Sequence, residues 1–159
     1  SSDSFMVSMW IYPIEEHSWS CALYVKYETG FFGMIPLAWE GHSSFRIRDS
    51  KEVDGWYDIS GCKLQVNEWS HYVVSYNAKT ETAYVYINGQ LVGNMKNVPG
   101  NRYAKRIVLG GDVFQPSFIG KICEVTFYNE IRDHDFVYNL HQSYVTRDDF
   151  IGFEIGIDK

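Results

Sequence analysis

The segment at residues 69–93 constrains the fold of this chain more than any other part of the sequence. Within it, residues 71–76 and residues 82–87 alternate in side-chain character with a period of two, which places successive side chains on opposite faces of a β-sheet. Asn88-Gly89 follows, and this pair is typical of a tight hairpin turn whose two central residues both need positive φ. Three further runs have the same alternating character. The sequence therefore predicts an all-β fold, a two-sheet antiparallel β-sandwich whose function lies on a sheet face or in the loops.

The rest of the chain is expected to form further strands and one helix. Strands are expected at residues 5–12, 21–27, 31–38, 44–49, 56–59, 106–109 and 120–129. One short C-terminal helix is expected at residues 133–144, where Asp133 can act as the N-cap. Apolar side chains recur there every four residues, at Phe136, Leu140 and Tyr144, and give the helix an apolar face. We expect this helix to form a lid over one end of the sandwich.

Length and composition are those of a single domain with its own core. A chain of 159 residues buries roughly 70% of its unfolded surface, and 45% of its residues are apolar, which is enough to fill an interior. We assign residues 1–145 to the sandwich and residues 146–159 to a C-terminal tail, whose strand-like residues 149–158 could add an edge strand. The N-terminus has no signal-peptide pattern, and we expect the chain to be a module attached to further domains of a longer protein.

The charge and the cysteines argue against several classes of function. A net charge of −6 argues against nucleic acid as a partner, since nucleic acid requires a basic footprint, and gives no reason to expect binding to a membrane surface of anionic lipid. No apolar run approaches the roughly 18 residues of a membrane-spanning helix. Cys21, Cys62 and Cys123 are odd in number and widely spaced, unlike a disulfide framework or a zinc site. We expect the three cysteines to act as small semi-polar residues, with Cys123 in the core. One disulfide between two of them remains an alternative.

Residues 44–49 carry the clearest candidate for a binding site. Alternation puts Arg46 and Arg48 on one face of this strand. Phe45 and Ile47 fall on the other face. Two guanidinium groups side by side repel each other unless carboxylates compensate them. An array of arginines and carboxylates offers planar forks of donors beside acceptors, which suits vicinal sugar hydroxyls or a sugar carboxylate.

Aromatic rings and carboxylates surround this strand in the sequence. The residues expected to bind ligand here are Trp39, Glu40, His42, Arg46, Arg48, Asp49, Trp56, Tyr57 and Asp58, with Glu52 and Asp54 as further carboxylates. The indole and phenol rings offer flat faces to a pyranose or furanose ring. The alternative is an ordinary exposed face with salt bridges, worth about 0–1 kcal/mol each, above tryptophans that lie in the core.

Two loops could complete such a site. Trp19, in the polar loop at residues 15–19, could close one side of it, although solvated loops of this composition are frequent. Asp112, in the loop at residues 110–116, could bind sugar or calcium. Calcium takes roughly six to eight oxygen ligands. Because the chain has no EF-hand-like run, a structural calcium ion would need ligands from separate loops.

Five motifs occur in an order that resembles a known family. They are FMVSMWIYP, WSHYVVSYN, AYVYINGQLVG, IVLGGD and FIGKICEVTFYNEIRDHDFVYNLH. Together they resemble the laminin-G/pentraxin-like branch of the concanavalin A-like lectins and glucanases over residues 5–144. Two features depart from that pattern, because Cys123 stands where an aspartate is common and the strand usually found upstream of the first one is missing. The resemblance implies a concanavalin A-like jelly roll, a module that extracellular proteins, many of them bacterial glycoside hydrolases, use to hold carbohydrate.

Relatives on this fold that hydrolyse glucans place two carboxylates on one strand, in a pattern such as E-x-D-x-E. Alternation then puts both glutamates on the same face, near the separation of about 5–5.5 Å that a retaining mechanism needs. This chain has no such pattern, because adjacent carboxylates such as Glu15-Glu16 would face opposite ways and Glu124 stands alone on its strand. We therefore expect no catalysis, and a glycoside hydrolase is the less favoured interpretation.

The residues and the resemblance leave the ligand open. A cluster rich in charge with few aligned rings favours a short or terminal glycan over a long flat chain. The similarity to bacterial carbohydrate-binding modules, including family 66, implies a fructan-like end, whereas the arginines favour an acidic sugar. The alternative class is an adhesion or structural laminin-G-like module that binds protein, although a protein-binding patch is more often broadly apolar. In either case we expect an extracellular module, secreted or on a cell surface.

Overall fold

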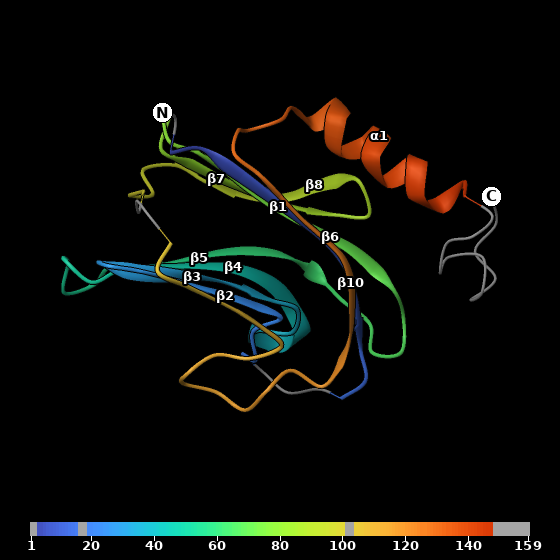
Figure 1. Ribbon diagram of the computed structural model, residues 1–159, viewed down its shortest axis with the longest axis horizontal. Helices are drawn as coiled ribbons and strands as arrows, with labels where there is room; N and C mark the ends of the chain where they lie inside the picture. The colour runs from blue at the N-terminus through green and yellow to red at the C-terminus, as the bar shows by residue number, and fades with distance from the viewer. Residues whose placement is uncertain (1–2, 16–18, 101–103, 148–159) are drawn as a thin grey trace.

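The computed structural model describes residues 3–15, 19–100 and 104–147, which form a sandwich of two five-stranded sheets and one α-helix (Figure 1). Sheet A has the strand order β10-β1-β6-β7-β8, and sheet B has the order β5-β4-β3-β2-β9. Neighbouring strands are antiparallel throughout. The elements are β1 (Phe5–Pro13), β2 (Leu23–Tyr27), β3 (Gly30–Ile35), the short 3-10 helix η1 (Trp39–Gly41), β4 (His42–Asp49), β5 (Trp56–Lys63), β6 (Ser70–Asn77), β7 (Thr82–Ile87), β8 (Gln90–Met95), β9 (Arg106–Leu109), β10 (Gly120–Tyr128) and α1 (His134–Val145). The predicted antiparallel sandwich with a short C-terminal helix is confirmed.

The hairpin at Asn88-Gly89 connects β7 to β8, as the sequence predicts. The φ angle is 51° at Asn88 and 80° at Gly89, and positive values at both central positions are those that this turn requires. Two strand ends differ from the expected ones by three residues or more. β3 ends at Ile35, before Pro36. β5 does not stop at residue 59, because its pairing with β4 continues to Lys63.

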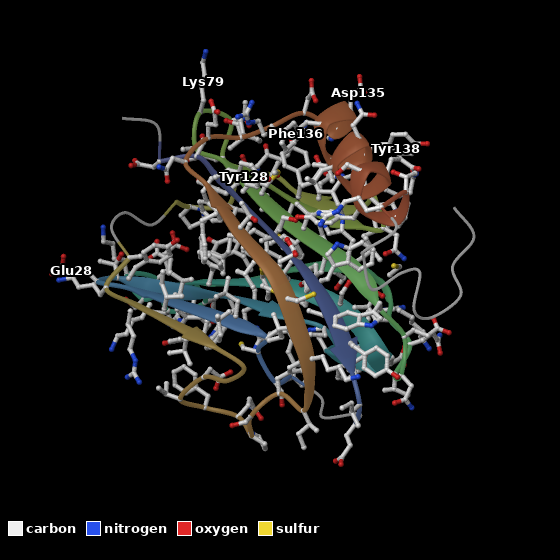
Figure 2. The ribbon with its side chains drawn as sticks, turned by 45° about the vertical axis from the view of Figure 1, so that its right-hand side comes forward. Glu28, Lys79, Tyr128, Asp135, Phe136 and Tyr138 are labelled. Carbon is white, nitrogen blue, oxygen red and sulfur yellow. The ribbon has the colours of Figure 1, made fainter. Side chains whose placement is uncertain are left out.

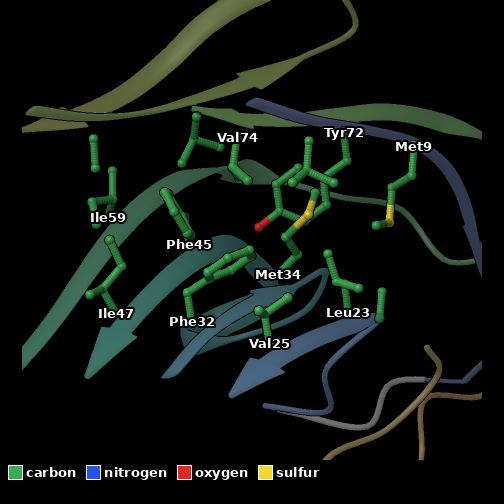
Figure 3. Close-up of a cluster of buried hydrophobic side chains, with 14 of the residues drawn as sticks. Met9, Leu23, Val25, Phe32, Met34, Phe45, Ile47, Ile59, Tyr72 and Val74 are labelled. Atoms are coloured by element: carbon green, nitrogen blue, oxygen red, sulfur yellow. The ribbon is translucent and has the colours of Figure 1, made fainter. Parts of the chain in front are cut away.

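Side chains from the inner faces of both sheets fill the space between them. Figure 3 shows Phe32 and Phe45 of sheet B pointing toward Tyr72 and Val74 of sheet A. The rings of Phe32 and Phe45 meet edge to face, with 5.5 Å between their centroids, a geometry that aromatic pairs prefer. Phe45, Tyr72 and Val74 have no solvent exposure. Because the inner faces are filled, a ligand must bind on an outer face, on an edge or in the loops.

Helix α1 lies on the outer face of sheet A (Figure 1), so the expectation that it forms a lid over one end of the sandwich is wrong. The Asp133 carboxylate accepts a hydrogen bond from the backbone N–H of Phe136 at 2.8 Å, which confirms the predicted N-cap. The Phe136 ring meets the Tyr128 ring of β10 edge to face (Figure 2), and Val137 is fully buried against Val73. The helix takes this position because its apolar face covers apolar side chains that sheet A directs outward. Within the part of the chain that the structure describes, no α-helix covers the outer face of sheet B.

All three cysteines lie in the described part of the chain and are free thiols. Cys21 is buried, whereas Cys123, which we expected in the core, is half-buried beside Trp10 and Tyr144 on the outer face of sheet A. The physical reason is its register, because Cys123 pairs with Trp10, which faces outward. The strand-like residues 149–158 lie outside the described residues, so the added edge strand stays a prediction. Among the described helices, none is long and apolar enough to cross a membrane.

The two sheets approach each other closely where β5 faces β8 and β7. A Cβ atom built at Gly93 of β8 would stand 2.1 Å from the carbonyl oxygen of Ser60 in β5. A Cβ built at Gly61 of β5 would stand 3.0 Å from a methyl carbon of Val85. Glycine at both positions lets the backbones of the two sheets come together. This lateral edge of the sandwich therefore depends on the absence of two side chains.

Candidate functional site

The outer face of sheet B presents two neighbouring rows of residues, with one residue from each of its five strands in each row. The first row, called the pair row, consists of Asp58, Arg46, Gly33, Tyr24 and Val108. The second row, called the basic row, consists of Trp56, Arg48, Phe31, Lys26 and Arg106. Members of a row are directly opposite each other in the strand register, and the alternation along each strand directs both rows outward. The burial of Phe45 and Ile47 in the core fixes this orientation for β4.

Arg46 and Asp58 form a bidentate ion pair at one end of the pair row. The Nε atom of Arg46 donates to Oδ1 of Asp58 at 2.6 Å, and Nη2 donates to Oδ2 at 2.9 Å. The two side chains keep 25% and 32% of their surface exposed, so a ligand can still reach them. The guanidinium carbon lies 4.2 Å from the centroid of the Trp19 ring and 4.9 Å from that of the Trp56 ring. A donor and an acceptor are thus fixed side by side between two indole rings.

Arg48 and Trp56 are neighbours in the basic row. The Nη1 atom of Arg48 donates to the backbone carbonyls of Asp49 and Glu52, which holds the side chain against the turn after β4. Its guanidinium carbon lies 5.0 Å from the centroid of the Trp56 ring, and Phe31 meets the same ring edge to face at 5.9 Å. Trp56 remains 49% exposed. Half of a rigidly supported indole is therefore available to a ligand.

A groove of about 340 Å³ runs along the basic row. Its floor includes Tyr24 and Phe31, and one wall is formed by Val113 and Phe114 from the loop after β9, which passes below sheet B in Figure 1. Phe114 is 64% exposed, yet its ring centroid lies 5.6 Å from that of Phe31 and 6.4 Å from that of Tyr24. The loop thus brings an aromatic ring over the middle of the sheet face.

Asp112 holds the shape of this loop. Its Oδ1 atom accepts from the backbone N–H groups of Phe114 and Gln115, at 2.6 and 2.8 Å. Burial raises the pKa of the neighbouring Cys21 thiol well above its usual range, and a hydrogen bond to Asp112 adds to the shift. Cys21 is therefore a neutral thiol and not a nucleophile. One oxygen of the Asp112 carboxylate is thus used in the turn, and through it Asp112 supports the groove wall.

The structure brings together only some of the residues that the sequence singled out. The outer face of sheet B holds Arg46, Arg48, Trp56 and Asp58. Trp19 contacts Arg46 from the loop between β1 and β2. The Trp19 loop is anchored there by a backbone hydrogen bond from Trp19 to the carbonyl of Leu37 at 2.8 Å.

Tyr57 and Asp49 do not belong to this group. Each lies one residue away from a row member on its strand, so its side chain points to the opposite face. Tyr57 packs against the core and donates its hydroxyl to Glu52 at 2.8 Å. Asp49 is buried and accepts from the backbone N–H of Lys51 at 2.9 Å.

The third group of expected residues lies at the start of β4. Trp39 and Glu40 sit on η1, where Trp39 is 67% exposed and Glu40 has a φ of 50°. His42 pairs with Lys63 at the first position of the strand. Arg46 is four residues further along β4, which corresponds to about 13 Å. His42 therefore stands apart from the Arg46–Asp58 pair along the strand, and Trp39 and Glu40 belong to the helix η1 that precedes it.

Several residues of this face were not singled out from the sequence, namely Tyr24, Phe31, Lys26, Arg106 and Phe114. Alternation in β2 indicates that Tyr24 and Lys26 share a face. Nothing in the local pattern indicates that this face lies beside Arg48. That information is in the pairing of β3 with both β2 and β4.

A second and larger groove of about 620 Å³ lies at the start of helix α1, on the other sheet. Its lining includes Tyr84, Tyr86, Asp133, His134 and Arg132. The Tyr86 hydroxyl is hydrogen-bonded to Nδ1 of His134 at 2.5 Å, and Asp133 caps the helix. Burial raises the pKa of Tyr86 to about 12. Because these polar groups already serve the protein, this groove offers a ligand fewer open contacts than the face of sheet B.

The predicted calcium ion has no evident ligand set. Among the described residues, no three or more His, Cys, Asp or Glu side chains gather closely enough to hold a metal. Asp112 uses one carboxylate oxygen in its turn. Calcium binding stays a prediction.

The comparisons with known proteins agree with this architecture. A family model described as the concanavalin A-like lectin/glucanases superfamily matches residues 1–137. No curated protein matches the chain. The similar solved structures include domain 4 of AbnA, a GH43 extracellular arabinanase from Geobacillus stearothermophilus, in complex with arabinotriose. It is 25% identical with a TM-score of 0.74, and the match covers 89% of this chain and 68% of that one.

Two further solved structures have the same fold at lower identity. The CBM40 of Ruminococcus gnavus IT-sialidase, bound to α2,3 sialyllactose, is 12% identical with a TM-score of 0.72, and the match covers 89% of this chain and 84% of that one. The SAP-like pentraxin of Limulus polyphemus is 14% identical with a TM-score of 0.65, and the match covers 94% of this chain and 72% of that one. At these identities the likeness concerns the fold alone.

Proposed function

The chain belongs to the concanavalin A-like lectin/glucanases superfamily, and we propose that it is a non-catalytic carbohydrate-binding module that holds a short or terminal glycan on the outer face of sheet B. The observation that carries this proposal is the Arg46–Asp58 pair between Trp19 and Trp56. The arabinanase domain in complex with arabinotriose and the CBM40 bound to sialyllactose support a sugar as ligand. We place the module in a larger secreted glycoside hydrolase or surface protein.

The pair suits two neighbouring hydroxyl groups of one sugar. A guanidinium has five N–H donors, and Arg46 uses two of its nitrogens toward Asp58. The remaining N–H groups can donate to one sugar hydroxyl, while Asp58 accepts from its neighbour. Such hydrogen bonds to charged groups are stronger than neutral ones. The half-exposed Trp56 ring can cover the apolar face of the same sugar.

The arrangement of the rings supports a short or terminal glycan. Trp19 and Trp56 both lie against one guanidinium, that of Arg46, and so gather at one point of the sheet face. A long flat chain would need coplanar rings at repeated spacing. A fructan-like end and an acidic sugar both remain candidates for the bound residue.

The absence of catalysis is part of the proposal. Hydrolysis of a glycosidic bond generally requires two carboxyl groups about 5–9.5 Å apart across the bond. In the two rows on the outer face of sheet B, Asp58 is the one carboxylate, and it is already paired with Arg46. A protein-binding adhesion module is the second candidate, and the observation that favours it is the outermost strand β9, where Ile107 and Leu109 are 52% and 55% exposed.

Replacing Arg46 with alanine is expected to weaken glycan binding roughly tenfold or more, since hydrogen bonds to charged groups contribute about 1.5–3 kcal/mol. A glycan array identifies the ligand, and calorimetry with that ligand measures the loss. Arg132→Ala is the matched control, because Arg132 is also ion-paired, to Glu130 at 2.7 Å, and also lies over an aromatic ring, that of Phe136 at 4.9 Å. Arg132 lines the groove on sheet A. The Arg132→Ala variant should therefore bind glycan as tightly as the parent.

Two outcomes would count against this function. If no glycan on the array is bound while protein partners are, the adhesion module becomes the better account. If Arg46→Ala remains folded and binds as tightly as the parent and the control, sugar is held elsewhere on the molecule.

A further inference from the structure

The basic row contains three cations and no carboxylate. Arg48, Lys26 and Arg106 lie on β4, β2 and β9, with Phe31 of β3 between the first two. Strands are about 4.8 Å apart, so the Cα atoms of Arg48 and Lys26, two strands apart, are separated by about 10 Å. The Cα atom of Arg106 is one strand further. The whole chain has a net charge of −6. Positive charge is therefore concentrated on one line across one sheet face of an acidic protein.

Aromatic side chains alternate with these cations. Trp56 and Phe31 belong to the row, and Phe114 covers it from the loop. The groove along the row is lined by Lys26 and Arg48, and Glu28 is the carboxylate in its lining. Glu28 is 3.8 Å from the ammonium group of Lys105, so a cation already faces it. The groove thus combines apolar walls with the side chains of Lys26 and Arg48.

We propose that the basic row is a second subsite of the glycan site and that it selects an acidic sugar, one that carries a carboxylate. This inference rests on the proposed function, because the row begins beside the Arg46–Asp58 pair. A sugar carboxylate in the groove accepts hydrogen bonds from Arg48 on one side and Lys26 on the other. The apolar face of the sugar ring lies against Trp56 and Phe114. The adjoining sugar of the same oligosaccharide then reaches the pair row.

The geometry favours an acidic sugar over the other polyanions. A nucleic acid would need a wide basic footprint to neutralise many phosphates, and this row is one residue wide beside a row that contains Asp58. The pair row offers both donor and acceptor, which suits hydroxyl groups. Carboxylates next to hydroxyls are the chemistry of uronic and sialic acids.

The test compares each acidic oligosaccharide with a neutral counterpart of the same shape. The probes are trigalacturonate and 3′-sialyllactose, each against its carboxyl-reduced form, measured by calorimetry at low and high salt. We expect at least one acidic probe to bind about tenfold more tightly than its counterpart, as a hydrogen bond to a charged group implies. High salt should reduce this difference, because exposed charges are screened.

Lys26→Gln assigns the effect to the basic row. It is expected to lower affinity for the acidic probe by roughly tenfold and affinity for the neutral counterpart by a clearly smaller factor, so that the preference for the acidic probe is reduced. The matched control is Lys79→Gln, the same change at an exposed position in the turn between β6 and β7, which projects into solvent in Figure 2. This control should bind both probes like the parent.

The failure of this inference differs from the failure of the proposed function. If both acidic probes bind no better than their neutral counterparts, or if Lys26→Gln and Lys79→Gln behave alike, the acidic subsite is refuted while the glycan site stands. If single-stranded DNA of equal charge competes as well as the acidic sugar, selection of a sugar carboxylate is also refuted. If neither these probes nor any glycan on an array binds, the proposed function fails with it.

Discussion

Replacing Gly93 with alanine is expected to lower the free energy of unfolding by about 3 kcal/mol. The new Cβ would stand 2.1 Å from the carbonyl oxygen of Ser60 and 3.0 Å from its carbonyl carbon. Both are backbone atoms of β5, so no side chain can rotate to make room. The sheets would have to separate at the edge where β8 meets β5, and the core side chains nearby would lose contacts.

Gly111→Ala is the control for this substitution. A Cβ at Gly111 would meet only the hydroxyl of Ser117, at 3.6 Å, which is an ordinary contact. Neither glycine has a positive φ, so the two substitutions differ in available space and not in backbone strain. Gly111→Ala should be neutral or stabilise by up to about 1 kcal/mol, through the reduced entropy of the unfolded chain. Chemical denaturation measures both, and equal effects would contradict the close approach of the two sheets.

Lowering the pH from about 7 to about 4 is expected to cost about 3 kcal/mol of stability through His71 alone. His71 is fully buried beneath helix α1. Its ring stacks on the rings of Trp10 and His141, with 5.1 and 5.5 Å between the ring centroids. Its Nε2 atom is hydrogen-bonded to the Ser8 hydroxyl at 2.7 Å. Burial lowers the pKa of His71 from 6.5 to about 3, and the nearby His141 adds to the shift.

The direction of this effect follows from where the proton binds. Below pH 6.5 the unfolded chain takes up a proton on His71, whereas the folded chain does so only near pH 3. The unfolded state therefore binds more protons in this window, and stability falls as the pH falls through it. Burial also lowers the pKa of His141, which acts in the same direction.

Denaturation of the parent and of His71→Gln at several pH values isolates this contribution, because all other titrating groups are common to both. The parent should lose more stability than the variant between pH 7 and pH 4. Should the variant fail to fold, an NMR titration of the His71 imidazole in the parent decides the question. An imidazole that becomes protonated near pH 6.5 in the folded protein would contradict the account.

The sequence predicted which way β4 faces, and the reason is local. A period of two in residues 44–49 places Arg46 and Arg48 together, and the structure has them on one face. Asp58 is one of five carboxylates close to this strand in the sequence, and the pattern could not identify it as the partner of Arg46. That choice depends on the register between β4 and β5.

The remainder of the site could not be predicted because it depends on pairing between distant strands. Tyr57 was grouped with Trp56 although adjacent residues of a strand face opposite ways, and only the pairing shows that Trp56 is the one beside Arg48. Lys26 and Phe31 belong to the basic row because β3 pairs with both β2 and β4. Phe114 lies against this row because the loop after β9 folds across the outer face of sheet B. Local patterns carry none of this information.

An NMR titration of the isotope-labelled domain with the oligosaccharide that binds best on a glycan array tests the central claim most directly. The account predicts that the largest chemical-shift changes occur at the Trp56 indole N–H and at the backbone amides of Arg46, Arg48 and Phe31. Changes centred on Tyr84 and His134, in the larger groove at the start of helix α1, would contradict it and place the sugar on the other sheet.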